Sequence, residues 1–317
     1  MTAELAANLG SAQSAYNVEG NEHTKLTVYA ATGPDWVRAH REALQDRLRE
    51  HGAILLRGMP ADLAVFNQVT EEIGGSLLTY TERSTPRSVV SGNIYTSTEY
   101  PAAESIPMHN ENSYSAHWPA RLFFLCDTAA ETGGATPIAD SRAMYRLLPS
   151  DLRERFEGGV TYARAFREGL GLTWQEAFQT DDRQAVEDYC TGNGQTYEWT
   201  DEGLRTRHVR PSFVTEPHTG ATVWFNQANL FHVSSLGEEV SEALLDLYPE
   251  EDLPRHAYFA DGSPIPQADL ATIKATYDEV GYAFPWQPGD IMVINNMLMA
   301  HGREPFTGKR RTLVAMT

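Results

Sequence analysis

The chain has 317 residues, of which 41% are hydrophobic and 21% charged, a composition typical of globular proteins and not of disordered or fibrous ones. Its 25 Lys and Arg residues against 43 Asp and Glu residues give a net charge of −18. This balance argues against nucleic acid or an anionic membrane as the main partner, because both bind basic surfaces.

The N-terminal segment, residues 1–24, is polar and has little periodicity, so we interpret it as an arm. It lacks the basic and apolar regions of a secretory signal. No apolar run in the chain approaches the ~20 residues needed to span a bilayer. We therefore expect a cytoplasmic protein with no membrane contact. The two cysteines, Cys126 and Cys190, follow no metal or disulfide pattern and are expected to be buried free thiols.

The first half of the chain alternates between strands and helices. Strands are predicted at residues 25–30 and 53–58, and helices at 34–52 and 61–75, the second ending at a Gly-Gly pair. Residues 76–140 are strand-like, with runs at 87–96, 121–127 and 136–140.

Residues 141–205 are predicted to form a largely helical insert, after which strands return at 210–216, 221–227, 290–295 and 310–316. No linker or composition shift divides residues 25–317, so we expect a single domain. The pattern predicts an α+β fold in which a double-stranded β-helix, or jelly roll, is flanked by helices and interrupted by the insert.

Several familiar motifs are absent from the sequence. The segment GREPFTGKR at 302–310 resembles a phosphate-binding loop, but its glycines are one residue too far apart and Arg310 stands where Ser or Thr is needed. GxGxxG, HExxH and GxSxG do not occur. Nucleotide cofactors, zinc peptidases and α/β-hydrolases therefore have no support.

One group of residues indicates metal chemistry. In the segment IPMHNENSY, His109 and Glu111 are two residues apart, so in an extended chain their side chains point the same way. Together they could supply two of the three ligands of a 2-His-1-carboxylate site, which suits non-haem Fe(II). His301, after the predicted strand at 290–295, is the best third ligand. His117 is a weaker rival because it lies beside Trp118 in a packing turn.

The other histidines that we considered are His208, His218, His232 and His256, which are expected at the surface or in packing roles. An anion site is also indicated near His301. A pair of arginines, Arg310 and Arg311, precedes the last apolar strand, and a guanidinium there could bind a carboxylate in two-point fashion. Strand neighbours face opposite sides, so periodicity alone does not choose between the two.

These blocks resemble a known family. HNENSY, ETGGATPIADSR and HGREPFTGKRRTLVAM, with LLRG, RSTPRSVVSGNIYTSTEYP and VWFNQANLFH, are similar to the taurine dioxygenase/clavaminate synthase superfamily of Fe(II)/2-oxoglutarate-dependent oxygenases. The resemblance covers about residues 50–317. It is strongest to the branch that acts on amino acids in nonribosomal peptide biosynthesis, including syringomycin-type aspartyl hydroxylases.

The resemblance implies that His109, Glu111 and His301 hold Fe(II). It further implies that Arg311, assisted by Thr136, binds the distal carboxylate of 2-oxoglutarate. Two departures stand out: many members carry Asp where this chain has Glu111, and the stretch from His301 to Arg311 is short. Because the carboxylate ligand is present, halogenation, which needs that position open for chloride, is disfavoured.

The implied reaction consumes O2 and 2-oxoglutarate, releases succinate and CO2, and oxidises a small amino-acid-like substrate, free or tethered to a carrier protein. Hydroxylation is the expected outcome, with desaturation, epoxidation or cyclisation as alternatives from the same iron centre. A metal-binding jelly roll without enzymatic activity is the alternative from another class, although it would not need Thr136 and Arg311. The oligomeric state stays open. We nominate as substrate contacts Arg83, Arg87, Asn110, Asn226 and Gln227.

Overall fold

The structure is a computed structural model that describes residues 16–79, 82–85, 88–97 and 100–317. In this part of the chain the largest sheet has eight strands, all neighbours antiparallel except one parallel pair. In spatial order they are β1 (Tyr16–Gly20), β2 (Lys25–Ala30), β3 (Ala53–Arg57), β16 (Ile291–Asn295), β7 (Arg121–Thr128), β19 (Arg311–Met316), β5 (Ile94–Thr96) and β4 (Val89–Ser91).

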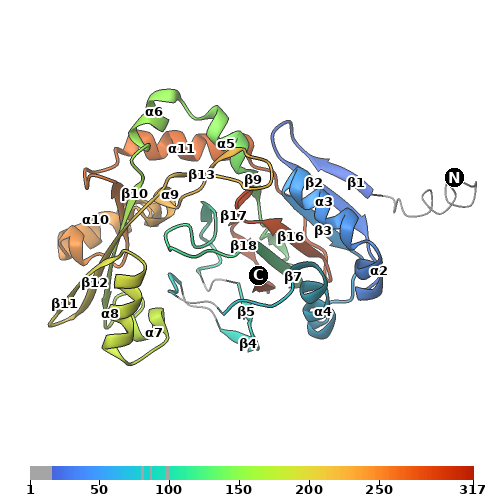
Figure 1. Cartoon of the computed structure of the whole chain (residues 1–317), viewed down its shortest axis with the longest axis horizontal. Coiled ribbons are helices and arrows are strands. Elements are labelled where there is room, and N and C mark those ends of the chain that lie inside the picture. Colours follow the sequence, from blue (N-terminus) through green and yellow to red (C-terminus); the bar gives the residue numbers. More distant parts are fainter. Residues whose placement is uncertain (1–15, 80–81, 86–87, 98–99) are drawn as a thin grey trace, which may run out of the picture.

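The two faces of this sheet bury different sets of side chains. On β16, Ile291 and Val293 pack with Phe66 on the outer face, whereas Met292 and Ile294 point inward. Three helices cover the outer face, and Figure 1 shows them together with β1–β3 at the right of the molecule. They are α2 (Pro34–Ala39), α3 (Arg41–His51) and α4 (Leu63–Gly74).

A smaller sheet packs against the inner face. It contains β6 (Ile106–His109), β17 (Met299–Arg303) and β9 (Ile138–Asp140) in that order. Ile138 and Met299 share a buried cluster with Met292 and Ile294 of the large sheet. β8 (Thr132–Gly133) and β18 (Phe306–Thr307) form a separate two-stranded ladder; in the chain β8 comes just before β9 and β18 just after β17. The two facing sheets thus form the β-sandwich that the alternating strands predicted.

A second region of the molecule is built on a four-stranded sheet, which lies at the left of Figure 1. Its strands are β11 (Thr196–Thr200), β12 (Gly203–Arg210), β10 (Val160–Arg167) and β15 (His256–Phe259). The helices α7 (Trp174–Phe178) and α8 (Arg183–Gly192) pack on Phe166 and Leu204. The predicted insert at 141–205 does contain helices, but β10 and β11 also lie within it and β12 begins at its end, so it is less uniformly helical than expected. Arg and Thr residues alternate with apolar ones in these strands, and this polar character concealed them.

The remaining elements join the two regions through one buried cluster that includes Trp224, Phe231 and Tyr162. They are α5 (Ser141–Leu147), α6 (Ser150–Arg155), β13 (Phe213–Thr215), β14 (Thr222–Trp224), α9 (Ala228–Phe231), the 3-10 turns η1 (Val233–Leu236) and η2 (Glu250–Asp252), α10 (Glu238–Leu247) and α11 (Gln267–Val280). The predicted helix after residue 141 is divided between α5 and α6, with Pro149 at the break.

Several predicted elements are confirmed, including the strands at 25–30, 53–57, 291–295 and 311–316. The N-terminal arm is partly contradicted. Residues 16–20 form β1, which pairs with β2, so the second half of the predicted arm belongs to the large sheet. Residues 1–15 lie outside the described residues. Both cysteines are buried and free as expected, and burial raises the pKa of each thiol to about 12.

In the described ranges, no helix combines the length and the apolar character that crossing a membrane would require.

Candidate metal centre and flanking cavities

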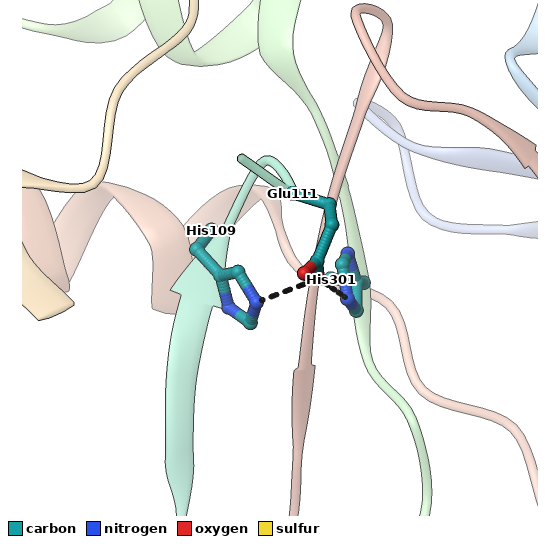
Figure 2. A group of neighbouring side chains, drawn as sticks. All are labelled: His109, Glu111 and His301. Atoms are coloured by element: carbon teal, nitrogen blue, oxygen red, sulfur yellow. Dashed lines mark ion pairs between the residues drawn. The ribbon is translucent and has the colours of Figure 1, made fainter. Parts of the chain in front are cut away.

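Three buried side chains from distant parts of the chain meet beside the small sheet. His109 Nε2 lies 3.6 Å from Glu111 Oε2, and His301 Nε2 lies 3.7 Å from the same oxygen. The two imidazole rings are 4.4 Å apart, centre to centre. Figure 2 shows Glu111 between the two rings, with both nitrogens directed at its carboxylate. The expected convergence of these three residues is confirmed.

Strand register places the two histidines. His109 ends β6 and His301 is the middle residue of β17, and the two are direct cross-strand partners. The register shifts between His301 and Arg303, and at Gly302 an added Cβ would lie 2.7 Å from the Ile106 carbonyl oxygen. The strands therefore approach too closely there for any residue with a side chain to fit without movement.

Glu111 is held by a turn and not by an extended strand. β6 ends at His109, and residues 111–114 form a turn in which Asn112 has a left-handed φ of 55°. Buried Asn296 fixes this turn from both sides. Its Oδ1 accepts from the Glu111 amide at 2.8 Å, and its Nδ2 donates to the Glu111 carbonyl at 2.9 Å. His109 and Glu111 converge as expected, although Glu111 lies in a turn. Nothing in the sequence indicated that Asn296 would hold this turn.

The donor set fits a divalent transition metal. His109 Nδ1 lies 2.8 Å from the Pro107 carbonyl oxygen, which can only accept, so Nδ1 carries the proton and Nε2 keeps its lone pair. The candidate ligand atoms of His109, Glu111 and His301 all lie within 4.8 Å of one another. Two imidazoles and one carboxylate on one side of a centre leave further positions open, which is the arrangement preferred by non-haem Fe(II).

A first cavity opens on one side of this cluster. His301, His109 and Phe124 line it, together with Thr136 and Arg310. The Arg310 guanidinium donates to the Gly134 carbonyl at 2.9 Å and to the Thr136 hydroxyl at 3.3 Å. Trp286 Nε1 also donates to Thr136 Oγ1, at 3.1 Å. A guanidinium and a hydroxyl thus face the same space.

The expectation for Arg311 is contradicted by its placement. Its side chain is 51% exposed and lies 3.4 Å from Asp127, outside the cavity lining. Arg310, Thr312 and Val314 line the cavity instead, because alternate residues of a strand face the same side. Burial lowers the pKa of Arg310 to about 10, and the nearby positive charge of Arg303 acts in the same direction. Arg310 is still cationic at neutral pH.

A second cavity lies beside His109 and Glu111 and does not include His301 or Arg310. Gln227 and Arg255 are among its lining residues. The Gln227 side chain donates to the Asn110 carbonyl at 2.7 Å, which anchors it beside the turn of Glu111. The nomination of Gln227 therefore has a geometric basis, whereas Arg255 was not singled out from the sequence.

The other nominated substrate contacts lie elsewhere. Asn110 and Asn226 are fully buried and line neither cavity. Asn110 Nδ2 donates to the Asn296 carbonyl and to Ser141, and Asn226 Nδ2 donates to the Ser212 carbonyl. This placement gives the two nominations no support, because both amide groups bind other protein groups and neither lines a cavity. Arg83 packs over the Tyr95 ring outside both linings, and Arg87 lies outside the described residues.

The remaining histidines have the packing or surface roles that were expected. His208 and His256 are buried, and His232 packs against His256 with ring centres 4.4 Å apart. The His218 side chain is 65% exposed and pairs with Glu216. Among the described residues, His109 and His301 are the only histidines that belong to a group of three or more potential metal ligands.

Comparison with known proteins identifies the class. Residues 22–317 match the family model described as taurine catabolism dioxygenase TauD, TfdA family. The chain therefore belongs to the TauD/TfdA family and is an Fe(II)/2-oxoglutarate-dependent dioxygenase with a jelly-roll fold. When bound, iron and 2-oxoglutarate supply the capacity to activate O2 for oxidation of an organic substrate. The metal-binding module without activity is excluded by this membership.

Two curated relatives are similar over most of the chain. The chain is 39% identical to the dapdiamide synthesis protein DdaC of Enterobacter agglomerans over 276 residues, covering 86% of this chain and 84% of that protein. It is 30% identical to a clavaminate synthase-like protein of Arabidopsis thaliana over 294 residues, covering 88% and 86% respectively.

Solved structures support the fold. PvcB of Pseudomonas aeruginosa matches with a TM-score of 0.56 at 16% identity, covering 95% of this chain and 90% of that chain. AAD-2, solved with Mn(II) and N-oxalylglycine, matches with a TM-score of 0.54 at 12% identity and covers 96% and 97%. These likenesses confirm the predicted jelly roll with flanking helices.

Proposed function

We propose that this dioxygenase hydroxylates an amino acid or an amino-acid derivative in natural-product biosynthesis. The observation that supports the proposal best is the arrangement of one buried His-Glu-His cluster between two separate cavities. One cavity suits the co-substrate and the other suits the molecule to be oxidised. Similarity to a dapdiamide synthesis protein supports the biosynthetic context.

His109, Glu111 and His301 are the proposed iron ligands. In the first cavity, Arg310 and Thr136 are positioned to bind the distal carboxylate of 2-oxoglutarate. A guanidinium can contact both oxygens of a carboxylate, and the Thr136 hydroxyl can donate a third hydrogen bond. Trp286 fixes that hydroxyl from the other side. Arg310 thereby takes the role that the family resemblance had given to Arg311.

Glu111 bears on the outcome of the reaction. Its carboxylate occupies the position that chloride would need, so the site favours oxygenation over halogenation. Desaturation, epoxidation and cyclisation use the same iron centre and differ in how the substrate is placed. Among these outcomes we propose hydroxylation, as in the syringomycin-type aspartyl hydroxylase branch. We place the reaction in the cytoplasm, with a substrate that is either free or attached to a carrier protein.

The direct test is a screen of free and carrier-bound amino acids with Fe(II), 2-oxoglutarate and O2. A hydroxylated product gains one oxygen atom and a desaturated product loses two hydrogen atoms, both of which mass spectrometry detects. Nuclear magnetic resonance then separates hydroxylation from epoxidation, and succinate should form in equal amount. The matched control is Glu111→Ala, which should give neither product nor succinate. Formation of product by that variant, or of a chlorinated product by the native protein, would contradict the proposal.

A further inference from the structure

Two arginines of the second region lie side by side next to the metal cluster. The ladder between β10 and β15 ends at the pair Ala163 and His256, and the next residues on the two strands are Arg164 and Arg255. The Arg164 guanidinium lies 5.6 Å from the Tyr114 ring centre, and the Arg255 guanidinium lies 6.0 Å from that of Phe231. The Tyr114 and Phe231 rings are 4.9 Å apart, so both cations face one aromatic cluster.

Protein groups near these arginines supply too little negative charge. The nearest carboxylate, Glu82, lies 3.9 Å from Arg164 Nη1, a nitrogen that is buried without a hydrogen-bond partner. Both Glu82 oxygens already accept hydrogen bonds, from the side chains of Ser115, Tyr189 and Gln195. Glu82 therefore binds other donors, and its contact with Arg164 is at the limit of an ion pair.

Arg255 has no compensating partner among the residues that the structure describes. Neither an ion pair within 4.0 Å nor a hydrogen bond reaches its guanidinium from them. Arg255 is half-buried at the wall of the second cavity, and its partial withdrawal from water lowers its pKa. An unpaired cation of this kind is unfavourable for folding and is typical of a site whose partner is a ligand. The contact with Phe231 is at the limit of a cation–π interaction and offsets little of that cost.

The position of Arg255 indicates in which cavity its ligand would bind. Arg255 lines the second cavity together with His109, Glu111 and Gln227. The first cavity has its own cation, Arg310, for 2-oxoglutarate. Arg255 is absent from that lining, so the two arginines serve different molecules.

We propose that Arg255 binds a carboxylate of the substrate that is oxidised, in the cavity beside His109 and Glu111, with Arg164 adding positive charge behind it. This inference rests on the proposed function and narrows its substrate class to amino-acid derivatives that keep a free carboxylate. A planar guanidinium binds a carboxylate at two points, which fixes both position and orientation. Arg255 would thus help to decide which carbon of the substrate lies nearest the iron.

The test compares ligands that differ only in charge. The probes are free L-amino acids and the pantetheine thioesters of those amino acids that have a second carboxyl group. Each probe is prepared in two forms, with its free carboxylate intact or converted to a carboxamide. Binding is measured by calorimetry to the protein loaded with Fe(II) and 2-oxoglutarate without O2. In the native protein the tightest ligand should be a carboxylate, favoured at least about tenfold over its carboxamide, as expected for a charge-assisted contact.

In Arg255→Gln this preference should fall below about twofold, whereas Arg255→Lys should keep an intermediate preference because a point charge remains. The matched control is Arg207→Gln, which removes an exposed arginine of β12 and should leave the preference intact. The Michaelis constant for 2-oxoglutarate should stay within about twofold in every variant, since Arg310 is untouched. Circular dichroism and thermal unfolding show whether Arg255→Gln is folded, and Arg255→Lys serves as the test if it is not.

Retention of the preference in Arg255→Gln would overturn the inference, as would tighter binding of carboxamides or no binding of any carboxylate by the native protein. Failure of the proposed function looks different. It would appear as no oxidised product and no substrate-dependent succinate from any probe, whatever the state of residue 255. Product formation that ignores Arg255 would leave the proposed function intact and remove only this inference.

Discussion

The two cavities beside the metal cluster share β6, whose Ile106 and His109 line both, but their other walls come from different parts of the molecule. The rest of the cavity of Arg310 and Thr136 comes mainly from strands of the jelly roll, including β19, β17 and the segment before β9. The cavity of Arg255 and Gln227 takes its walls from β6, α9 and the end of the loop before β15. The cavity proposed for the co-substrate thus belongs to the sandwich, whereas the second cavity also depends on the loop that leads into the four-stranded sheet.

This difference indicates how one family can serve many substrates. Groups that every reaction needs sit on strands whose register is fixed by the core, where a change would disturb the fold. The groups that we propose select the substrate sit largely outside these strands, where a change need not move the iron ligands. The following variants test that division, beginning with the largest expected effect.

Glu111→Ala removes the carboxylate that both histidines face. We expect at least a ~100-fold loss of succinate formation, because removal of even an outer-shell partner costs 10–100-fold in metal affinity. Iron content after gel filtration should fall in parallel. The control is Glu104→Ala, on the loop before β6, which should behave as the native protein. Full activity with bound iron in Glu111→Ala would remove Glu111 from the ligand set.

Arg310→Gln and Arg311→Gln test which of these two neighbouring arginines, which face opposite sides of β19, binds 2-oxoglutarate. We expect Arg310→Gln to raise the Michaelis constant for 2-oxoglutarate by about 100-fold, since a hydrogen bond to a charged group contributes about 1.5–3 kcal/mol. Arg311→Gln should change it by less than about twofold because the side chain faces Asp127 and solvent. Steady-state kinetics at saturating substrate measure both. The reverse result would restore Arg311 to the anion site.

Asn296→Ala removes the clamp on the turn of Glu111. We expect a loss of about 2–3 kcal/mol in the free energy of unfolding, because buried backbone groups of Glu111 and Pro119 lose their partners. Asn296→Asp should be no better, since a carboxylate cannot donate to the two carbonyl groups. Urea denaturation measures the stability, and iron titration measures the metal affinity, which should fall in both variants. Unchanged iron affinity would show that the turn holds Glu111 without Asn296.

The smallest expected effect is on the pH dependence of stability, and it comes from His256 in the four-stranded sheet. Burial lowers the pKa of His256 to about 3, with the neighbouring His232 and Arg207 acting in the same direction. The unfolded chain binds this proton at about pH 6.5, so stability is complete above that pH and is lost as the pH falls toward 3. The loss attributable to His256 is about 2 kcal/mol at pH 5.

Urea unfolding at several pH values should show this slope in the native protein and a shallower one in His256→Gln. His218→Gln is the control, because that imidazole is largely exposed and should leave the slope unchanged. Equal slopes in the native protein and His256→Gln would mean that another group causes the acid sensitivity.

The predictable parts of the fold were those in which burial leaves a plain pattern. β3, β16 and β19 are short apolar runs bounded by turn residues, and they lie where the sequence predicts them. β10 and β12 were missed because arginines such as Arg164 and Arg205 alternate with apolar residues. A partner that stabilises such a charge, like Asp252 beside Arg205, comes from tertiary structure and cannot be read from the sequence.

The site divides in the same way. His109, Glu111 and His301 could be found because residue chemistry and spacing identify a ligand set before any fold is known. The choice between Arg310 and Arg311 could not be made, since it depends on which way β19 turns at its first residue. Arg255 belongs to no motif. It becomes visible only through the absence of a counter-charge around it, which is a property of packing.

The direct pairing of His109 with His301 has a consequence for the quality of purified protein. If β17 slips by a single residue along β6, the imidazole of residue 301 turns to the opposite face of the sheet, and the proposed iron site loses one of its three ligands. The iron-to-protein ratio of a preparation therefore counts the fraction of molecules whose central strands are paired in the native alignment.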